Sequence, residues 1–105
     1  MMQTQTTMQL TYEKAIDSLR ELRDNFGPYM WFSEDVDVYE NSGIILESLS
    51  KEQRSPTQAE LEILIELFNR HAHACWGDIS FELADRARDA LDFLHYQAGL
   101  NPPTR

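Results

Sequence analysis

Apolar side chains recur at steps of three and four residues through most of this chain, the spacing that places them on one face of an α-helix. The first such stripe covers residues 11–26 and begins at Thr11, a residue type that caps helix N-termini well. Gly27-Pro28 ends it, because glycine adopts a left-handed C-terminal turn and proline cannot continue a helix. This spacing restricts the chain to folds that pack amphipathic helices together.

Two later segments repeat the pattern and are also predicted to be helices. One begins at Ser55-Pro56-Thr57-Gln58, which has the spacing of a capping box, and ends at Gly77. Its apolar residues cover two faces, which predicts the central and most buried helix. The other begins near Asp78 or Ser80 and ends at Gly99, where the leucine that follows fits a Schellman ending.

The segment over residues 33–53 admits two interpretations. As a helix, or two short ones, it starts with Ser33 as the N-cap and with two acids in the first turn, where the helix dipole favours carboxylates. As a hairpin, Val36-Asp37-Val38 alternates along one strand and Asn41-Ser42-Gly43 turns the chain back. We favour the helix, because the neighbouring segments are helical and an isolated hairpin is marginally stable.

Together these segments predict an all-α fold, a small single-domain bundle of about four helices. A chain of 105 residues has room for one domain, and a hydrophobic content of 42% is enough to build a core. We expect residues 1–105 to form this single helical domain, with a flexible N-terminal segment over 1–9 and a short C-terminal tail over 101–105.

The chain is acidic, with 18 acidic against 9 basic residues and a formal net charge of −9. Such a charge opposes direct binding to nucleic acid, whose phosphates need a positive surface, and favours a basic partner. Cys75 is the only cysteine, so no internal disulfide marks an oxidising compartment. There is no signal peptide and no run of ~20 apolar residues, so we expect a cytoplasmic protein that does not enter membranes.

Histidine spacing offers two pairs of potential metal ligands. His71 and Cys75 are four residues apart and Asp92 and His95 are three apart, as in metal sites of helical bundles. A di-iron bundle needs two Glu-x-x-His pairs, and the chain has none. It also lacks the phosphate-binding glycine loops and the nucleophile elbow of common enzymes. We therefore expect no metal, no cofactor and no catalytic residue, with Cys75 packed in the core.

Three Glu-x-x-Asp pairs each place two acids on one helix face, namely Glu21/Asp24, Glu34/Asp37 and Glu82/Asp85. They resemble the acids with which all-α nucleotide pyrophosphohydrolases hold Mg²⁺ against a pyrophosphate, although the companion Glu-x-x-Glu of those enzymes is absent. The resemblance implies an alternative function, a small Mg²⁺-dependent hydrolase whose acids are pooled from two helices in a cleft.

Acidic residues are densest directly after a run of large apolar residues. Residues 33–54 hold six acids and two basic residues, and they follow Tyr29-Met30-Trp31-Phe32. Aromatic anchors beside a charged rim are typical of protein interfaces, whereas the alternative is that Trp31 and Phe32 cap the core and the acids are simply solvated. We predict a partner-binding surface made of Tyr29, Trp31, Glu34, Asp35, Asp37 and Glu40.

These observations predict a non-enzymatic protein that binds and inhibits a partner protein by covering a basic surface that handles nucleic acid. In size and charge the chain is similar to small inhibitors of phages and mobile elements, including anti-CRISPR and anti-restriction proteins. It is also similar to toxin-neutralising immunity proteins, which are an alternative in the same class. A further alternative is a homodimer formed through the apolar helix that begins at Ser55.

Overall fold

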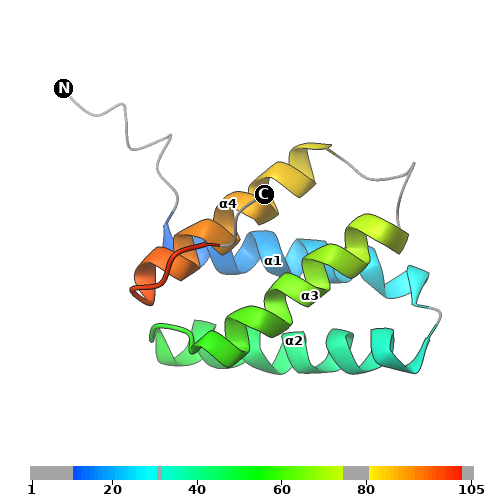
Figure 1. The fold of residues 1–105 in the computed structure, drawn as a ribbon, viewed down its shortest axis with the longest axis horizontal. Coiled ribbons are helices and arrows are strands. Elements are labelled where there is room, and N and C mark those ends of the chain that lie inside the picture. The colour runs from blue at the N-terminus through cyan, green and yellow to red at the C-terminus, as the bar shows by residue number, and fades with distance from the viewer. Residues whose placement is uncertain (1–10, 31, 75–80, 103–105) are drawn as a thin grey trace.

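The computed structural model describes residues 11–30, 32–74 and 81–102. Over these residues the chain forms α1 (Tyr12–Phe26), the short 3-10 helix η2 (Gly27–Tyr29), α2 (Ser33–Glu52), α3 (Gln58–Ala74) and α4 (Phe81–Gln97). The four long helices run lengthwise along the molecule and no strand accompanies them in the described residues (Figure 1). The prediction of a small all-α bundle is confirmed.

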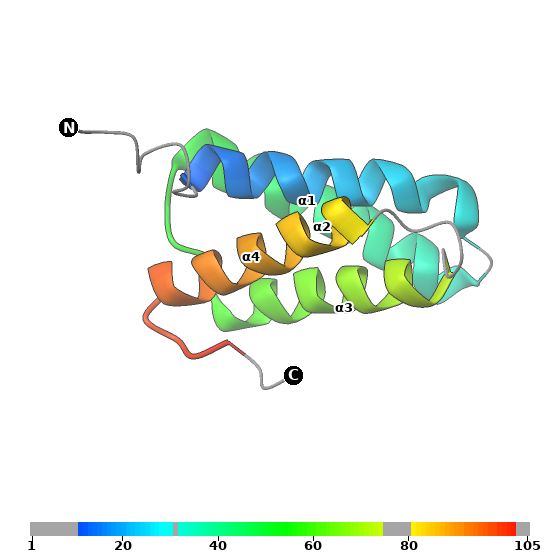
Figure 2. The ribbon, with the colours of Figure 1, turned by 90° about the horizontal axis from the view of Figure 1, so that it is seen from above.

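The long helices are arranged so that α1 and α3 each pack against the other three, while α2 and α4 lie on opposite sides (Figures 1 and 2). The third helix was predicted to be central, and α1 shares that place with it. The inner faces meet in one core, whose largest fully buried side chains are Ile16, Leu19, Leu22, Phe26, Leu46, Leu49, Leu61, Leu64, Leu67, His71 and Leu94.

Two predicted helix ends are confirmed. Thr11 Oγ1 accepts a hydrogen bond from the Lys14 N–H at 3.2 Å and so caps α1. After α4, Gly99 adopts a left-handed φ of 75°, and the Leu100 N–H donates to the His95 carbonyl at 2.8 Å. This is the Schellman geometry, which satisfies carbonyls that a helix end would otherwise leave without donors.

At two other ends the helix boundary is confirmed, but the predicted capping is wrong. Gly27 is right-handed, with φ −47° and ψ −49°, so the chain passes from α1 into η2 without a left-handed turn. Phe32, not Ser33, is the N-cap of α2, and its N–H donates to Asp35 Oδ2 at 3.2 Å. A carboxylate at the third helical position satisfies the cap's N–H in this way, so the helix begins without a serine cap.

One unbroken helix of 20 residues forms α2, and the hairpin alternative is therefore wrong. Gly43 makes room for a side chain of α1 instead of turning the chain. A Cβ at Gly43 would lie 2.6 Å from the Arg23 guanidinium, which stacks 3.7 Å from the centroid of the Tyr39 ring. The Arg23 Nε also donates to the Tyr39 carbonyl at 2.6 Å. The glycine thus allows α1 and α2 to pack closely.

Some predictions concern residues outside the described ranges: Trp31, Cys75, Gly77, the N-terminal segment over 1–9 and the end of the C-terminal tail. The predicted start of the last helix also falls outside them, and its described part begins at Phe81. Within the described ranges, none of the helices combines the length and the apolar character needed to cross a membrane.

Candidate functional site

Most of the residues predicted to bind a partner lie on or next to the first half of α2. Glu34, Asp37 and Glu40 are exposed on this helix, and Tyr29 is half-buried in η2 just before it. Trp31 lies outside the described residues. The structure therefore brings three of the predicted acids to one exposed stretch of helix.

Asp35 differs from these acids because it is only 6% exposed. Its Oδ1 accepts a hydrogen bond from Arg70 Nη1 of α3 at 2.6 Å, and its Oδ2 accepts the cap N–H of Phe32. Arg70 also donates to Glu66 at 2.7 Å, and the hydrogen bonds that it donates to these two carboxylates raise the pKa of its guanidinium. Asp35 thus holds the start of α2 against α3, and we leave it out of the candidate surface.

Apolar side chains also reach solvent on α2, and they are aligned. Four large apolar residues are exposed in the described part of the chain, and three of them share one i, i+4 row: Phe32, Val36 and Ile44, exposed by 66%, 39% and 66%. Glu40 occupies the remaining position of the row. We call these four residues the α2 ridge. Its signal in the sequence is Ile44. Helical spacing in this segment gives two lines, and Ile44 lies on neither: Val36, Tyr39, Gly43, Leu46 and Ser50 on one, and Val38, Ile45 and Leu49 on the other.

The exposed acids of and beside the α2 ridge make no ion pair within the described residues. No lysine or arginine occurs over residues 24–50. Glu34, Asp37 and Glu40 have no ion-pair partner among the described residues. Arginines of α1 and α3 that reach α2 bind other groups on it: Arg70 pairs with Asp35, and Arg23 donates to the Tyr39 carbonyl. These three carboxylates are therefore free of direct ion pairs in the described residues, although Arg23 and Lys51 line the same groove as Glu40.

A shallow groove of about 710 Å³ runs along α2 beside the ridge. Seven of its eight lining residues come from α2, among them Glu40, Gly43 and Ile44, and the eighth is Arg23 of α1. At Gly43, which has no side chain, the Arg23 guanidinium lies against the helix and forms part of the groove lining. The candidate surface therefore combines a raised apolar row with a depression alongside it.

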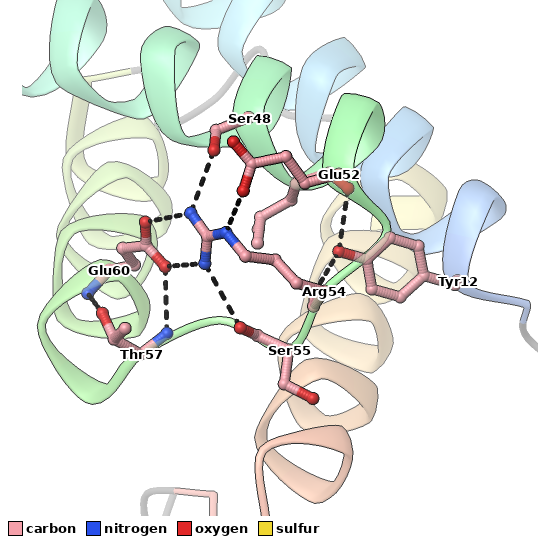
Figure 3. Close-up of polar contacts among 8 residues, drawn as sticks. Tyr12, Ser48, Glu52, Arg54, Ser55, Thr57 and Glu60 are labelled. Carbon is pink, nitrogen blue, oxygen red and sulfur yellow. Dashed lines mark hydrogen bonds and ion pairs between the residues drawn. The ribbon is translucent and has the colours of Figure 1, made fainter.

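At the junction of α2 and α3 the acids are paired with an arginine, unlike the exposed acids of the candidate surface (Figure 3). The two Nη atoms of Arg54 donate to the two Glu60 carboxylate oxygens at 2.9 and 2.8 Å, and its Nε donates to Glu52 at 2.8 Å. The Tyr12 hydroxyl lies 2.5 Å from the Arg54 carbonyl oxygen and 3.1 Å from that of Leu49. Hydrogen bonds from Arg54 lower the pKa of Glu60 to about 2. We call Tyr12, Glu52, Arg54 and Glu60 the Arg54 hub.

The Arg54 hub also sets where α3 begins. Thr57 Oγ1 accepts the Glu60 N–H at 3.1 Å, and Glu60 Oε1 accepts the Thr57 N–H at 2.9 Å, which is a reciprocal capping box. The predicted box at Ser55 is wrong by two residues, and Ser55 Oγ donates instead to the Gln97 carbonyl at 3.1 Å. Because Glu60 serves both the cap and the ion pair, this junction supports the fold.

The two buried histidines, His71 and His95, have structural partners. His71 is fully buried with its Nε2 2.7 Å from Asn25 Oδ1, and burial lowers its pKa. His95 is also buried, with Nδ1 2.7 Å from the Leu91 carbonyl oxygen. Among the described residues, no group of three or more histidine, cysteine, aspartate or glutamate side chains is placed to hold a metal ion.

The three Glu-x-x-Asp pairs lie on separate helices, and all six acids are exposed. One of them, Glu21 of α1, is already bound to Arg86 of α4, and the hydrogen bond lowers its pKa. The hydrolase alternative needs such acids gathered around a metal, and within the described ranges none of them belongs to a metal-holding group.

No protein-family model matches this chain, and no curated protein or solved structure is significantly similar to it. Its fold and its candidate site define it as a small acidic helical bundle that exposes one aligned apolar row among unpaired acids.

Proposed function

We propose that this protein is a non-enzymatic binder that covers a basic surface of another protein. One observation carries the proposal: Glu34, Asp37 and Glu40 are exposed on α2 and have no ion-pair partner among the described residues. Exposed acids of this kind are well solvated and add little to stability, but they attract and orient a basic partner.

A basic protein surface commonly serves to hold nucleic acid, whose phosphates need positive charge. Covering such a surface with carboxylates competes with the phosphates, so binding would also inhibit. The proposal therefore places the protein among cytoplasmic inhibitors of the anti-CRISPR and anti-restriction type, encoded by phages and mobile elements. A toxin-neutralising immunity protein would use the same surface, and the identity of the bound protein separates the two.

The test compares two triple variants that change the net charge equally. The first is Glu34→Gln with Asp37→Asn and Glu40→Gln on α2. The control, on the opposite side of the bundle, replaces Glu82, Asp85 and Asp89 of α4 by the matching amides. Tagged wild type and both variants are used to capture proteins from a bacterial lysate, which are identified by mass spectrometry.

We expect the wild type and the α4 variant to retain the same basic protein and the α2 variant to lose it. With that protein purified, its association rate with the wild type should fall as salt is raised, because steering between exposed charges is screened. Retention of every specific partner by the α2 variant would refute the proposed surface.

A further inference from the structure

The apolar side chains of the α2 ridge are aligned, not scattered. Phe32, Val36 and Ile44 follow the i, i+4 direction that forms the ridges of a helix surface. At 1.5 Å per residue the row is roughly 18 Å long. Single exposed apolar residues are ordinary, whereas a grouped set with a polar rim marks an interaction site. The fourth exposed large apolar residue in the described ranges, Tyr96, lies on α4, on the other side of the bundle.

The groove beside Ile44 gives this row a matching depression. It lies over Gly43, where the Arg23 guanidinium fills the space that a Cβ would take. When two helices pack, the side-chain ridges of one settle into the grooves of the other. A raised row with a groove at its side is therefore the surface that a second helix needs.

We propose that the α2 ridge and its groove dock a basic amphipathic helix of the partner protein. The inference rests on the proposed function and names the element that binds. The apolar face of the incoming helix covers Phe32, Val36 and Ile44, and its lysines and arginines reach Asp37 and Glu40 at the rim. This is recognition through an amphipathic helix, with anchors at helical spacing.

Charge and shape both favour this occupant. A peptide that binds by adding a strand needs a sheet edge, and the part of the chain that the structure describes has no strand. Nucleic acid is repelled by the acids of the rim. A second copy of the chain would bring Asp37 and Glu40 against a surface that carries the same exposed acids, and like charges oppose association.

The test uses a synthetic peptide of about 18 residues, roughly 27 Å long as a helix, in which leucines recur at helical spacing and lysines fill the other positions. A second peptide replaces each lysine by glutamate, and a third replaces each leucine by glutamine. Binding to the ¹⁵N-labelled full chain is followed by amide chemical shifts, for the wild type and for Ile44→Ser, Val36→Ser and Tyr96→Ser. Tyr96 is the matched control, because it is as exposed as Ile44.

We expect the leucine–lysine peptide alone to bind, with the largest shifts over residues 36–47. Ile44→Ser should weaken its binding at least about tenfold, as for an interface anchor, and Tyr96→Ser should change it less than about twofold. The inference is overturned if the peptide does not bind, if the shifts map elsewhere, or if the glutamine peptide binds equally well. It is also overturned if sedimentation shows a dimer that Ile44→Arg dissociates, because the occupant is then a second copy.

Failure of the inference and failure of the proposed function give different results. If binding depends on Asp37 and Glu40 but not on Ile44, the acids bind a basic surface and the helix docking is wrong. If binding depends on Ile44 but the Asp37→Asn, Glu40→Gln variant binds as well as the wild type at low and at high salt, the proposed role of the acids is wrong.

Discussion

The C-terminal end of α2 leads directly to the Arg54 hub. There Arg54 lies 2.8 Å from a carboxylate oxygen of Glu52 and 2.8 Å from one of Glu60. The N-terminal half of α2 carries Glu34 and Asp37, which have no such partner among the described residues. The two regions belong to one helix and contain similar acids. What separates them is which acids an arginine reaches: Arg54 binds Glu52 and Glu60, whereas Arg70 binds only Asp35 of the acids in the N-terminal half.

Acids of the same type therefore contribute to this protein in two ways. At the Arg54 hub the carboxylates are committed to hydrogen bonds that join α2 to α3, so changing them should cost stability. At the α2 ridge the acids and the apolar row face solvent, so changing them should cost binding and leave the fold intact. Each of the following variants tests one side of this division.

The largest difference in unfolding free energy is expected between variants on the inner and outer faces of α2. Leu49 is fully buried near the Arg54 hub, and Leu49→Ala should lower the free energy of unfolding by about 2–5 kcal/mol through lost burial and a cavity. Ile44→Ala on the ridge should change it by at most about 0.5 kcal/mol. Urea unfolding followed by circular dichroism measures both. An Ile44→Ala effect above about 2 kcal/mol, a value typical of core positions, would contradict the exposed position of the ridge.

Glu60→Gln should weaken the Arg54 hub, because a neutral amide cannot replace two charge-assisted hydrogen bonds to Arg54. We expect a loss of about 1–3 kcal/mol at neutral pH. The folded pKa of about 2 is below the ordinary 4.5, so the carboxylate stabilises the fold above pH 4.5 and this contribution is lost as the pH falls toward 2.

The difference in unfolding free energy between wild type and Glu60→Gln should therefore shrink over the same pH range. Urea titrations at several pH values measure it, with Asp89→Asn as the control, since Asp89 is exposed and has no ion-pair partner in the described ranges. If the difference in unfolding free energy stayed constant down to pH 2, the ion pair between Glu60 and Arg54 would not be the source of that difference.

A smaller change in stability is expected for Gly43→Ala, at a residue that lies between the N-terminal half of α2 and the Arg54 hub. Gly→Ala in an open helix raises stability by up to about 1 kcal/mol. Here the new Cβ would displace the Arg23 guanidinium from Tyr39, so the gain should be absent in the wild type and should return in an Arg23→Ala background. A double-mutant cycle measures this coupling, which we expect to be about 1 kcal/mol. Full stabilisation by Gly43→Ala alone would mean that Arg23 does not need the space.

The smallest effect on stability is expected from Asp37→Asn combined with Glu40→Gln. Both acids are exposed and unpaired among the described residues, so the free energy of unfolding should change by no more than about 0.5 kcal/mol. The comparison with Glu60→Gln is direct, because each change removes carboxylate charge without shortening a side chain. If the double variant were as destabilised as Glu60→Gln, the claim that only the acids of the Arg54 hub contribute to stability would be wrong.

Part of the candidate site could be predicted from the sequence. The acids Glu34, Asp37 and Glu40 were named because they are clustered, and clustering is visible along the chain. Asp35 stands in the same cluster, but its carboxylate is bound by Arg70, which is 35 residues away. The apolar row was missed, because an apolar residue on a helix counts as core until the covered face is known.

The sequence by itself determined where helices form and roughly how many there are, because helix formation depends on local spacing, turn residues and caps. It also determined the net charge and its concentration before Lys51. The tertiary structure decided which acids are neutralised, which apolar side chains stay exposed and why Gly43 sits within a helix. Those properties depend on groups from other helices, such as Arg23, Arg70 and Tyr12, whose approach no local pattern specifies.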